Sequence, residues 1–86
     1  MPDCWYEFPD TQKQADAISA LKRGADAFGY SVMVFEAPDL GPGVKRASVT
    51  GNFADCKELY GHVVSALYLG MARPSRRPDD DNLIPN

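Results

Sequence analysis

The sequence predicts one α+β domain over residues 1–71, built in the order β-α-β-β-α, and then a flexible, charged, proline-rich tail over residues 72–86. Three observations predict this α+β fold. Three short runs are rich in aromatic and β-branched residues, two longer stretches repeat apolar residues every three or four positions, and a Pro/Gly cluster separates the second run from the third. Length and composition agree, because 86 residues allow one domain and 44% hydrophobic residues suit a folded chain.

The first strand and the first helix follow from residues 4–29. Residues 4–8 (Cys-Trp-Tyr-Glu-Phe) favour a strand, and Pro9 marks its end because proline has no amide hydrogen for a sheet ladder. Thr11 and Gln14 have the spacing of a helix capping box, with Asp10 as an alternative cap. Apolar residues then recur at helical spacing up to a helix end near Gly29: Ile18, Leu21, Ala25 and Phe28.

A hairpin is predicted over residues 30–53. Residues 30–37 are β-branched and aromatic, and they run into Pro-Asp-Leu-Gly-Pro-Gly at 38–43, a dense cluster of turn residues. Residues 44–53 supply the return strand, where Ala47 and Val49 alternate with polar residues. One face of that strand should therefore contact water.

The second helix should begin at Asp55, which has the right spacing to Glu58 for a cap with a carboxylate in the first turn. It contributes the larger part of the apolar core through Leu59, Tyr60, Val63, Val64, Leu67 and Met71. Residues 72–86 hold three prolines and six charges, too little apolar surface to offset the entropy of ordering them. We therefore expect a tail there.

The run at 30–37 is apolar on both sides, with Val32 and Val34 pointing one way and Met33 and Phe35 the other. A right-handed crossover puts the first helix on one face of a three-stranded mixed sheet, and the second helix packs beside it. The arrangement resembles a ferredoxin-like domain without its last strand. The opposite face should expose Trp5 and one of the two apolar pairs. The sequence does not decide which of the two pairs is exposed.

No residue pattern points to catalysis, a metal or a cofactor, so we expect no enzyme. His62 is the only histidine, Cys56 reads as a packed apolar thiol, and the glycines at 41–43 lack the helix and Lys of a phosphate loop. The string at 79–83 (Asp-Asp-Asp-Asn-Leu) resembles the metal-binding signature of a phage-type Holliday-junction resolvase family, in which paired aspartates hold Mg²⁺. We interpret it instead as a solvated acidic run.

The net charge and the number of cysteines limit the classes of partner and the cellular location that we expect. The net charge of −3 and the pI near 4.9 make direct nucleic-acid binding unlikely and favour a protein partner with a basic surface. An RNA-binding sheet face stays a minority interpretation, because the third strand has no aromatic residue before Phe53. Two cysteines without a signal peptide predict reduced thiols and a cytoplasmic location, and no apolar run is long enough for a membrane span.

Together these observations predict a small, non-enzymatic protein-binding module. Its size and acidity are similar to those of phage-encoded inhibitors of host defence, such as anti-CRISPR proteins, although no motif is shared. We expect a homodimer joined through the exposed sheet face. The alternative is an oligomeric small-ligand-binding or catalytic domain with a pocket at the subunit junction. The predicted partner-binding residues are Trp5, Met33, Phe35, Glu36 and Asp39.

Overall fold

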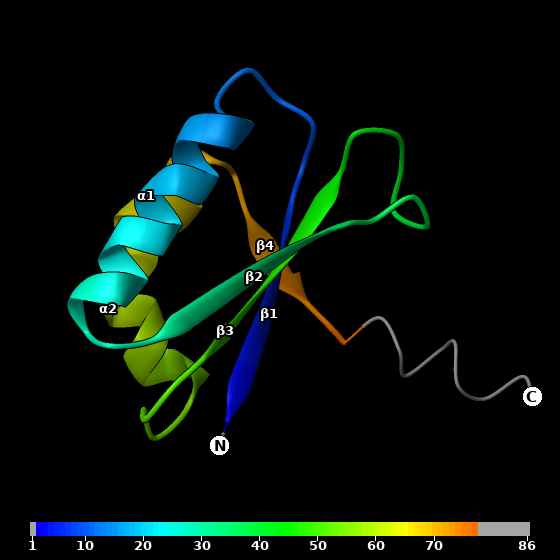
Figure 1. The fold of residues 1–86 in the computed structure, drawn as a ribbon. Helices are drawn as coiled ribbons and strands as arrows, with labels where there is room; N and C mark the ends of the chain where they lie inside the picture. Colours follow the sequence, from blue (N-terminus) through cyan, green and yellow to red (C-terminus); the bar gives the residue numbers. More distant parts are fainter. Residues whose placement is uncertain (1, 78–86) are drawn as a thin grey trace, which may run out of the picture.

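A computed structural model of the protein describes residues 2–77, which form one antiparallel sheet with two helices packed on one of its faces (Figure 1). The predicted α+β class and the two helices are confirmed. Along the chain the elements are β1 (Asp3–Phe8), α1 (Gln14–Ala27), β2 (Ser31–Glu36), β3 (Lys45–Thr50), α2 (Cys56–Leu69) and β4 (Arg73–Ser75).

The sheet differs from the prediction in two ways. It has four strands in the order β2-β3-β1-β4, and every neighbouring pair is antiparallel. β1 and β2 do run in the same direction, as the helical crossover requires, but β3 lies between them, so no parallel pair forms and the predicted mixed sheet is wrong.

The fourth strand lies inside the segment predicted as a tail. β4 pairs with the edge of β1, so that Trp5 lies opposite Ser75, Tyr6 opposite Pro74 and Glu7 opposite Arg73. A proline is tolerated there because β4 is the outermost strand. The remaining part of the predicted tail, residues 78–86, which includes the acidic run at 79–83, lies outside the described residues.

Strand alternation separates a helix-covered face from an open one. On β1, Cys4, Tyr6 and Phe8 point to the helices and are buried. The cross-strand neighbours of Cys4 and Tyr6 on β3 are Val49 and Ala47, which are buried on the same face. The core between sheet and helices is completed by buried residues of both helices and of the loop before α2: Ala17, Ile18, Leu21, Ala25, Phe53, Leu59, Val63, Ala66 and Leu67.

Gln14 connects the start of α1 to the hairpin loop rather than capping the helix. Its side-chain amide donates hydrogen bonds to the carbonyl oxygens of Phe8 (3.1 Å) and Gly43 (2.8 Å). Gly43 has φ +77°, and a Cβ at this position would lie 2.3 Å from the Asp10 carboxylate, so only glycine fits. The predicted capping box is wrong because Gln14 is itself the first residue of α1 and is already engaged in these contacts.

The start of α2 agrees with the sequence prediction. An Asp55 carboxylate oxygen accepts a hydrogen bond from the Glu58 backbone amide (2.9 Å), and the Glu58 side chain accepts one from the Ala54 amide (3.3 Å). The Glu58 amide, which the helix start leaves without an intrahelical partner, is thereby satisfied, and so is the Ala54 amide just before the N-cap residue.

Candidate interaction surfaces

The open face of the sheet carries an apolar strip made of Trp5, Met33 and Phe35. These three side chains come from β1 and β2 and meet across β3, where the small Ser48 lies between Met33 and Trp5. The rings of Trp5 and Phe35 have centroids 5.5 Å apart, and Met33 is 58% exposed. The register resolves the alternative left open by the sequence, because Val32 and Val34 pack against the core and Met33 and Phe35 face outward.

A shallow hollow of about 430 Å³ lies beside this strip. Asp3 and Arg77 form an ion pair at its edge, and the indole nitrogen of Trp5 donates a hydrogen bond to the Asp3 carboxylate (3.2 Å). Burial alone would raise the pKa of Asp3, but the hydrogen bonds from Arg77 and Trp5, with the positive charge of Arg77, outweigh it and lower the pKa. Asp3 therefore stays ionised and holds the Trp5 indole in place.

A buried arginine stands at the other end of the open face. Arg46 on β3 donates two hydrogen bonds to the Asp39 carboxylate (2.9 and 2.8 Å) and one to the Ser75 hydroxyl (3.2 Å). Its side chain is only 6% exposed, whereas that of Asp39 is 58% exposed. The hydrogen bonds from Arg46 hold the pKa of Asp39 below its ordinary value. Asp39, predicted as a partner contact, thus fixes the hairpin loop to the sheet.

Glu36, also predicted as a partner contact, does not join the strip. It is the residue after Phe35 on β2, so its side chain alternates to the other side of the strand, and it forms an ion pair with Lys45 (3.2 Å). Glu7 and Arg73 form a further pair on the open face (3.4 Å). The structure therefore brings together Trp5, Met33 and Phe35, and leaves Glu36 away from them.

The charge of the described part of the fold is balanced, although the whole chain has a net charge of −3. All nine Lys and Arg of the chain lie within residues 2–77, and so do nine of its twelve Asp and Glu. The other three acids are Asp79, Asp80 and Asp81, outside the described residues. The excess negative charge of the chain therefore comes from these three aspartates.

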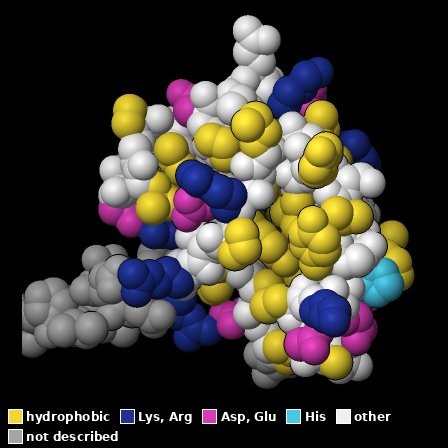
Figure 2. All heavy atoms as spheres, turned by 180° about the vertical axis from the view of Figure 1, so that it is seen from behind, with side chains coloured by type: hydrophobic (Ala, Val, Ile, Leu, Met, Phe, Trp, Pro, Cys, Tyr) yellow, Lys and Arg dark blue, Asp and Glu magenta, His cyan; other side chains and the backbone are white. Residues whose placement is uncertain are grey.

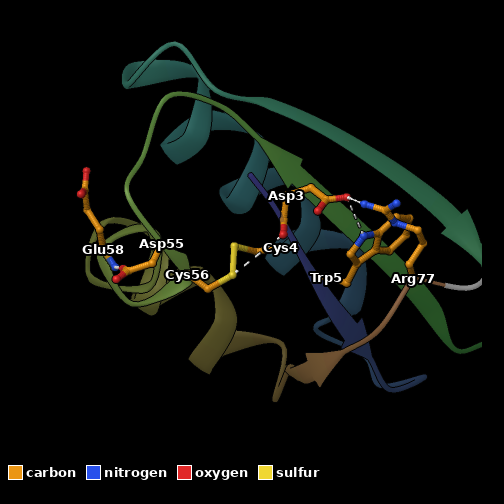
Figure 3. The surroundings of a disulfide bond; sticks show 7 residues. All are labelled: Asp3, Cys4, Trp5, Asp55, Cys56, Glu58 and Arg77. Atoms are coloured by element: carbon orange, nitrogen blue, oxygen red, sulfur yellow. Dashed lines mark hydrogen bonds and ion pairs between the residues drawn. A yellow bond between two sulfur atoms is a disulfide. The ribbon is translucent and has the colours of Figure 1, made fainter. Parts of the chain in front are cut away.

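The two cysteines form a disulfide, so the prediction of reduced thiols is wrong, as is that of a packed apolar Cys56. Cys4 on β1 and Cys56 at the first turn of α2 have Cα atoms 5.8 Å apart, and Figure 3 shows the bond joining the sheet to the helix. Cys4 is buried, whereas Cys56 is exposed. The cytoplasmic location was predicted together with the reduced thiols, and it stays a prediction that the disulfide does not favour.

A second apolar surface was missed by the sequence analysis. It consists of Tyr60, Val64, Tyr68 and Met71, here called the α2 stripe; the sequence pattern assigned Tyr60, Val64 and Met71 to the core and did not place Tyr68. In the structure Tyr60, Tyr68 and Met71 are exposed, Tyr68 most of all at 84%, and Val64 is partly exposed. α2 lies behind α1 in Figure 1, and Figure 2, seen from behind, shows hydrophobic side chains gathered near the centre of this side.

In comparisons with known proteins, no family model, curated sequence or solved structure matches the chain. Within residues 2–77, neither helix has the length and apolar character needed to cross a membrane.

The Asp39–Arg46 pair predicts how acid affects stability. Because the folded-state pKa of Asp39 is lowered, its stabilisation is complete above the ordinary value of 3.8 and is lost as the pH falls through the folded pKa. Asp39→Asn should lower the thermal midpoint at neutral pH. Below pH 3.8, the stability of this variant should fall less with decreasing pH than that of the parent. Glu36→Gln, which breaks an exposed pair, is the control and should follow the parent. If the thermal midpoints of Asp39→Asn and of the parent fall in parallel as the pH is lowered, the Asp39–Arg46 pair does not account for the loss of stability in acid.

Proposed function

We propose that the protein is a non-enzymatic protein-binding module whose contact surface is the apolar strip of the open face. The observation that carries this proposal is that Trp5, Met33 and Phe35 come together on the one sheet face that no described helix covers. Exposed aromatic and methionine side chains rimmed by polar groups are typical of protein contacts. Here the rim consists of the ion pairs Asp3–Arg77, Glu7–Arg73 and Asp39–Arg46.

The chemistry of the face favours a contact that is mainly apolar at its centre. Its acids are paired with arginines, so it offers no excess of negative charge to a basic partner. A basic partner surface remains a prediction that rests on Asp79, Asp80 and Asp81. An inhibitory role of the anti-CRISPR type likewise stays a prediction, because it rests on size and net charge.

A capture experiment tests the proposal. Immobilised parent protein and a Met33→Glu variant are each incubated with an extract of the cells that encode the chain, and the retained proteins are identified by mass spectrometry. Met33 is more than half exposed, so the variant should fold, but its carboxylate would be desolvated in the contact. We expect Met33→Glu to lose the proteins that the parent retains. Tyr68→Glu, on the other side of the molecule, is the control and should keep them.

The same proteins retained by Met33→Glu as by the parent would contradict the proposal. The change can also be followed directly, since Trp5 is the only tryptophan of the chain and stands in the strip. A partner that covers the strip should alter the fluorescence of Trp5.

The hollow beside Trp5 favours one alternative function, the binding of a small ligand. It holds about 430 Å³, within the range of small-molecule sites, and combines aromatic side chains with Ser48, Thr50, Asp3 and Arg77. Native mass spectrometry of the purified protein would reveal a retained ligand. A mass equal to that of the bare chain, with no change of Trp5 fluorescence across a set of small metabolites, would argue against this alternative.

A further inference from the structure

The outer side of α2 lacks the charged residues that keep an exposed helix in water. From Leu59 to Ala72 the sequence contains no Lys, Arg, Asp or Glu. The buried residues Leu59, Val63 and Leu67 account for one side of the helix. A helix that is apolar on more than one side is usually covered on more than one side.

The α2 stripe forms a shaped surface rather than scattered contacts. Tyr60, Val64 and Tyr68 follow one another at four-residue intervals and so share one side of the helix. Beside them is a hollow of about 390 Å³ lined by Val64, Ser65, Tyr68 and Leu69. Such a hollow has room for a side chain from a facing helix.

We propose that α2 pairs with α2 of a second copy, antiparallel across a two-fold axis that passes by Val64. The part of the stripe on the helix is symmetric about this residue, since Tyr60 precedes it and Tyr68 follows it by four positions. An antiparallel pair centred there brings Tyr60 of each copy to Tyr68 of the other and Val64 to its own counterpart. Two-fold contacts join one surface patch to itself, and aromatic pairs add stabilisation beyond the area they bury.

The charge pattern favours a second copy over a charged partner. A basic or acidic surface would find no complementary charge between Leu59 and Ala72, whereas a second α2 has no charge to desolvate there. The interface is small: a helix of 14 residues is about 21 Å long, and one side of such a helix offers less than the area of about 800 Å² per partner that stable complexes bury. The association should therefore be reversible and depend on concentration.

This pairing leaves the strip of the open face free. α2 covers the opposite face of the sheet from Trp5, Met33 and Phe35. In this proposal the α2 stripe, and not the strip predicted from the sequence, forms the homodimer contact. A dimer of this kind presents two strips to other proteins, and its existence does not depend on the proposed function.

Sedimentation equilibrium from micromolar to millimolar concentration tests the pairing. The parent should show a monomer–dimer equilibrium, and Tyr68→Glu should weaken it at least about tenfold, because each contact would bury a carboxylate without a partner. Adding Tyr60→Lys to the same chain should recover most of the association, since the new lysine of one copy faces the new glutamate of the other. The two changes are eight positions apart and cannot pair within one helix. Met33→Glu should associate as the parent does.

A covalent readout complements the variants. Val64→Cys should form an intermolecular disulfide rapidly under mild oxidation, because the two side chains meet at the axis, and Ser19→Cys on the exposed side of α1 should not. Peptide mapping distinguishes this bond from the Cys4–Cys56 bond. A parent that stays monomeric at millimolar concentration, a loss of association in Met33→Glu instead of Tyr68→Glu, or no recovery in the double variant would each overturn the proposal.

Discussion

Reduction of the Cys4–Cys56 disulfide is expected to lower the thermal midpoint of the protein by roughly 15–30 °C. The bond closes a loop with a sequence separation of 52, which contains α1, β2 and β3. Opening a loop of that length releases chain entropy worth about 4 kcal/mol in the unfolded state. A chain of this size has a total stability of about 4–13 kcal/mol, so the loss is a large share of it.

Thermal melts followed by circular dichroism, with and without a thiol reductant, measure this effect. The matched control is the double variant Cys4→Ala/Cys56→Ser, with the smaller apolar residue at the buried position and the hydroxyl at the exposed one. The variant should melt where the reduced parent melts and should not respond to reductant. A parent midpoint that is unchanged after complete reduction, verified by alkylation and mass, would show that the bond adds no stability.

The disulfide should also make partner binding depend on whether the compartment is oxidising or reducing. In an oxidising compartment the bond persists, whereas a cytoplasm rich in glutathione tends to keep thiols reduced. Because Cys4 is next to both Asp3 and Trp5 on β1, opening the bond would loosen the strand that carries part of the open face. We therefore expect partner capture by the strip to be weaker for the reduced protein.

Local patterns predicted most of the elements, because those patterns act through neighbouring residues. The Asp55 cap depends on residues three positions apart, and the hairpin at 38–43 on turn residues in sequence. Alternation along the run that forms β2 predicted that one of two apolar pairs would be exposed, and only the pairing of this edge strand with β3 selected Met33 and Phe35.

The features that the sequence did not predict depend on distant parts of the chain. β4 is held by backbone pairing with the edge of β1, so Arg-Pro-Ser needs no apolar alternation to form it. The disulfide needs β1 and the start of α2 to meet in space, which no spacing in the sequence shows. For α2, a helix with apolar residues on more than one side fits several orientations, so periodicity alone did not separate Leu67, which is buried, from Tyr60 and Met71, which are exposed.

Truncation of Leu67 to alanine is expected to cost about 2–5 kcal/mol of the free energy of unfolding. Leu67 is 3% exposed, in the core between α2 and the sheet, where a cavity left by the lost methyl groups cannot fill with water. Leu69→Ala is the matched control, since Leu69 lies two residues further on the same helix and is 40% exposed. The same chemical change there should cost about 1 kcal/mol, because 40% of Leu69 already contacts water and solvent can fill the space that the methyl groups leave.

Urea denaturation of both variants with the disulfide intact measures the two costs side by side. A loss at Leu67 several times larger than that at Leu69 would show that α2 is seated on the sheet by the side that the structure buries, with the α2 stripe facing outward. Equal losses at the two positions would mean that Leu69 is also covered in solution. Since residues 2–77 leave Leu69 exposed within one copy, the cover would have to come from outside the described part of that copy. Repeating the Leu69→Ala measurement at higher protein concentration separates these cases, because a cost that grows with concentration points to the second copy paired at α2.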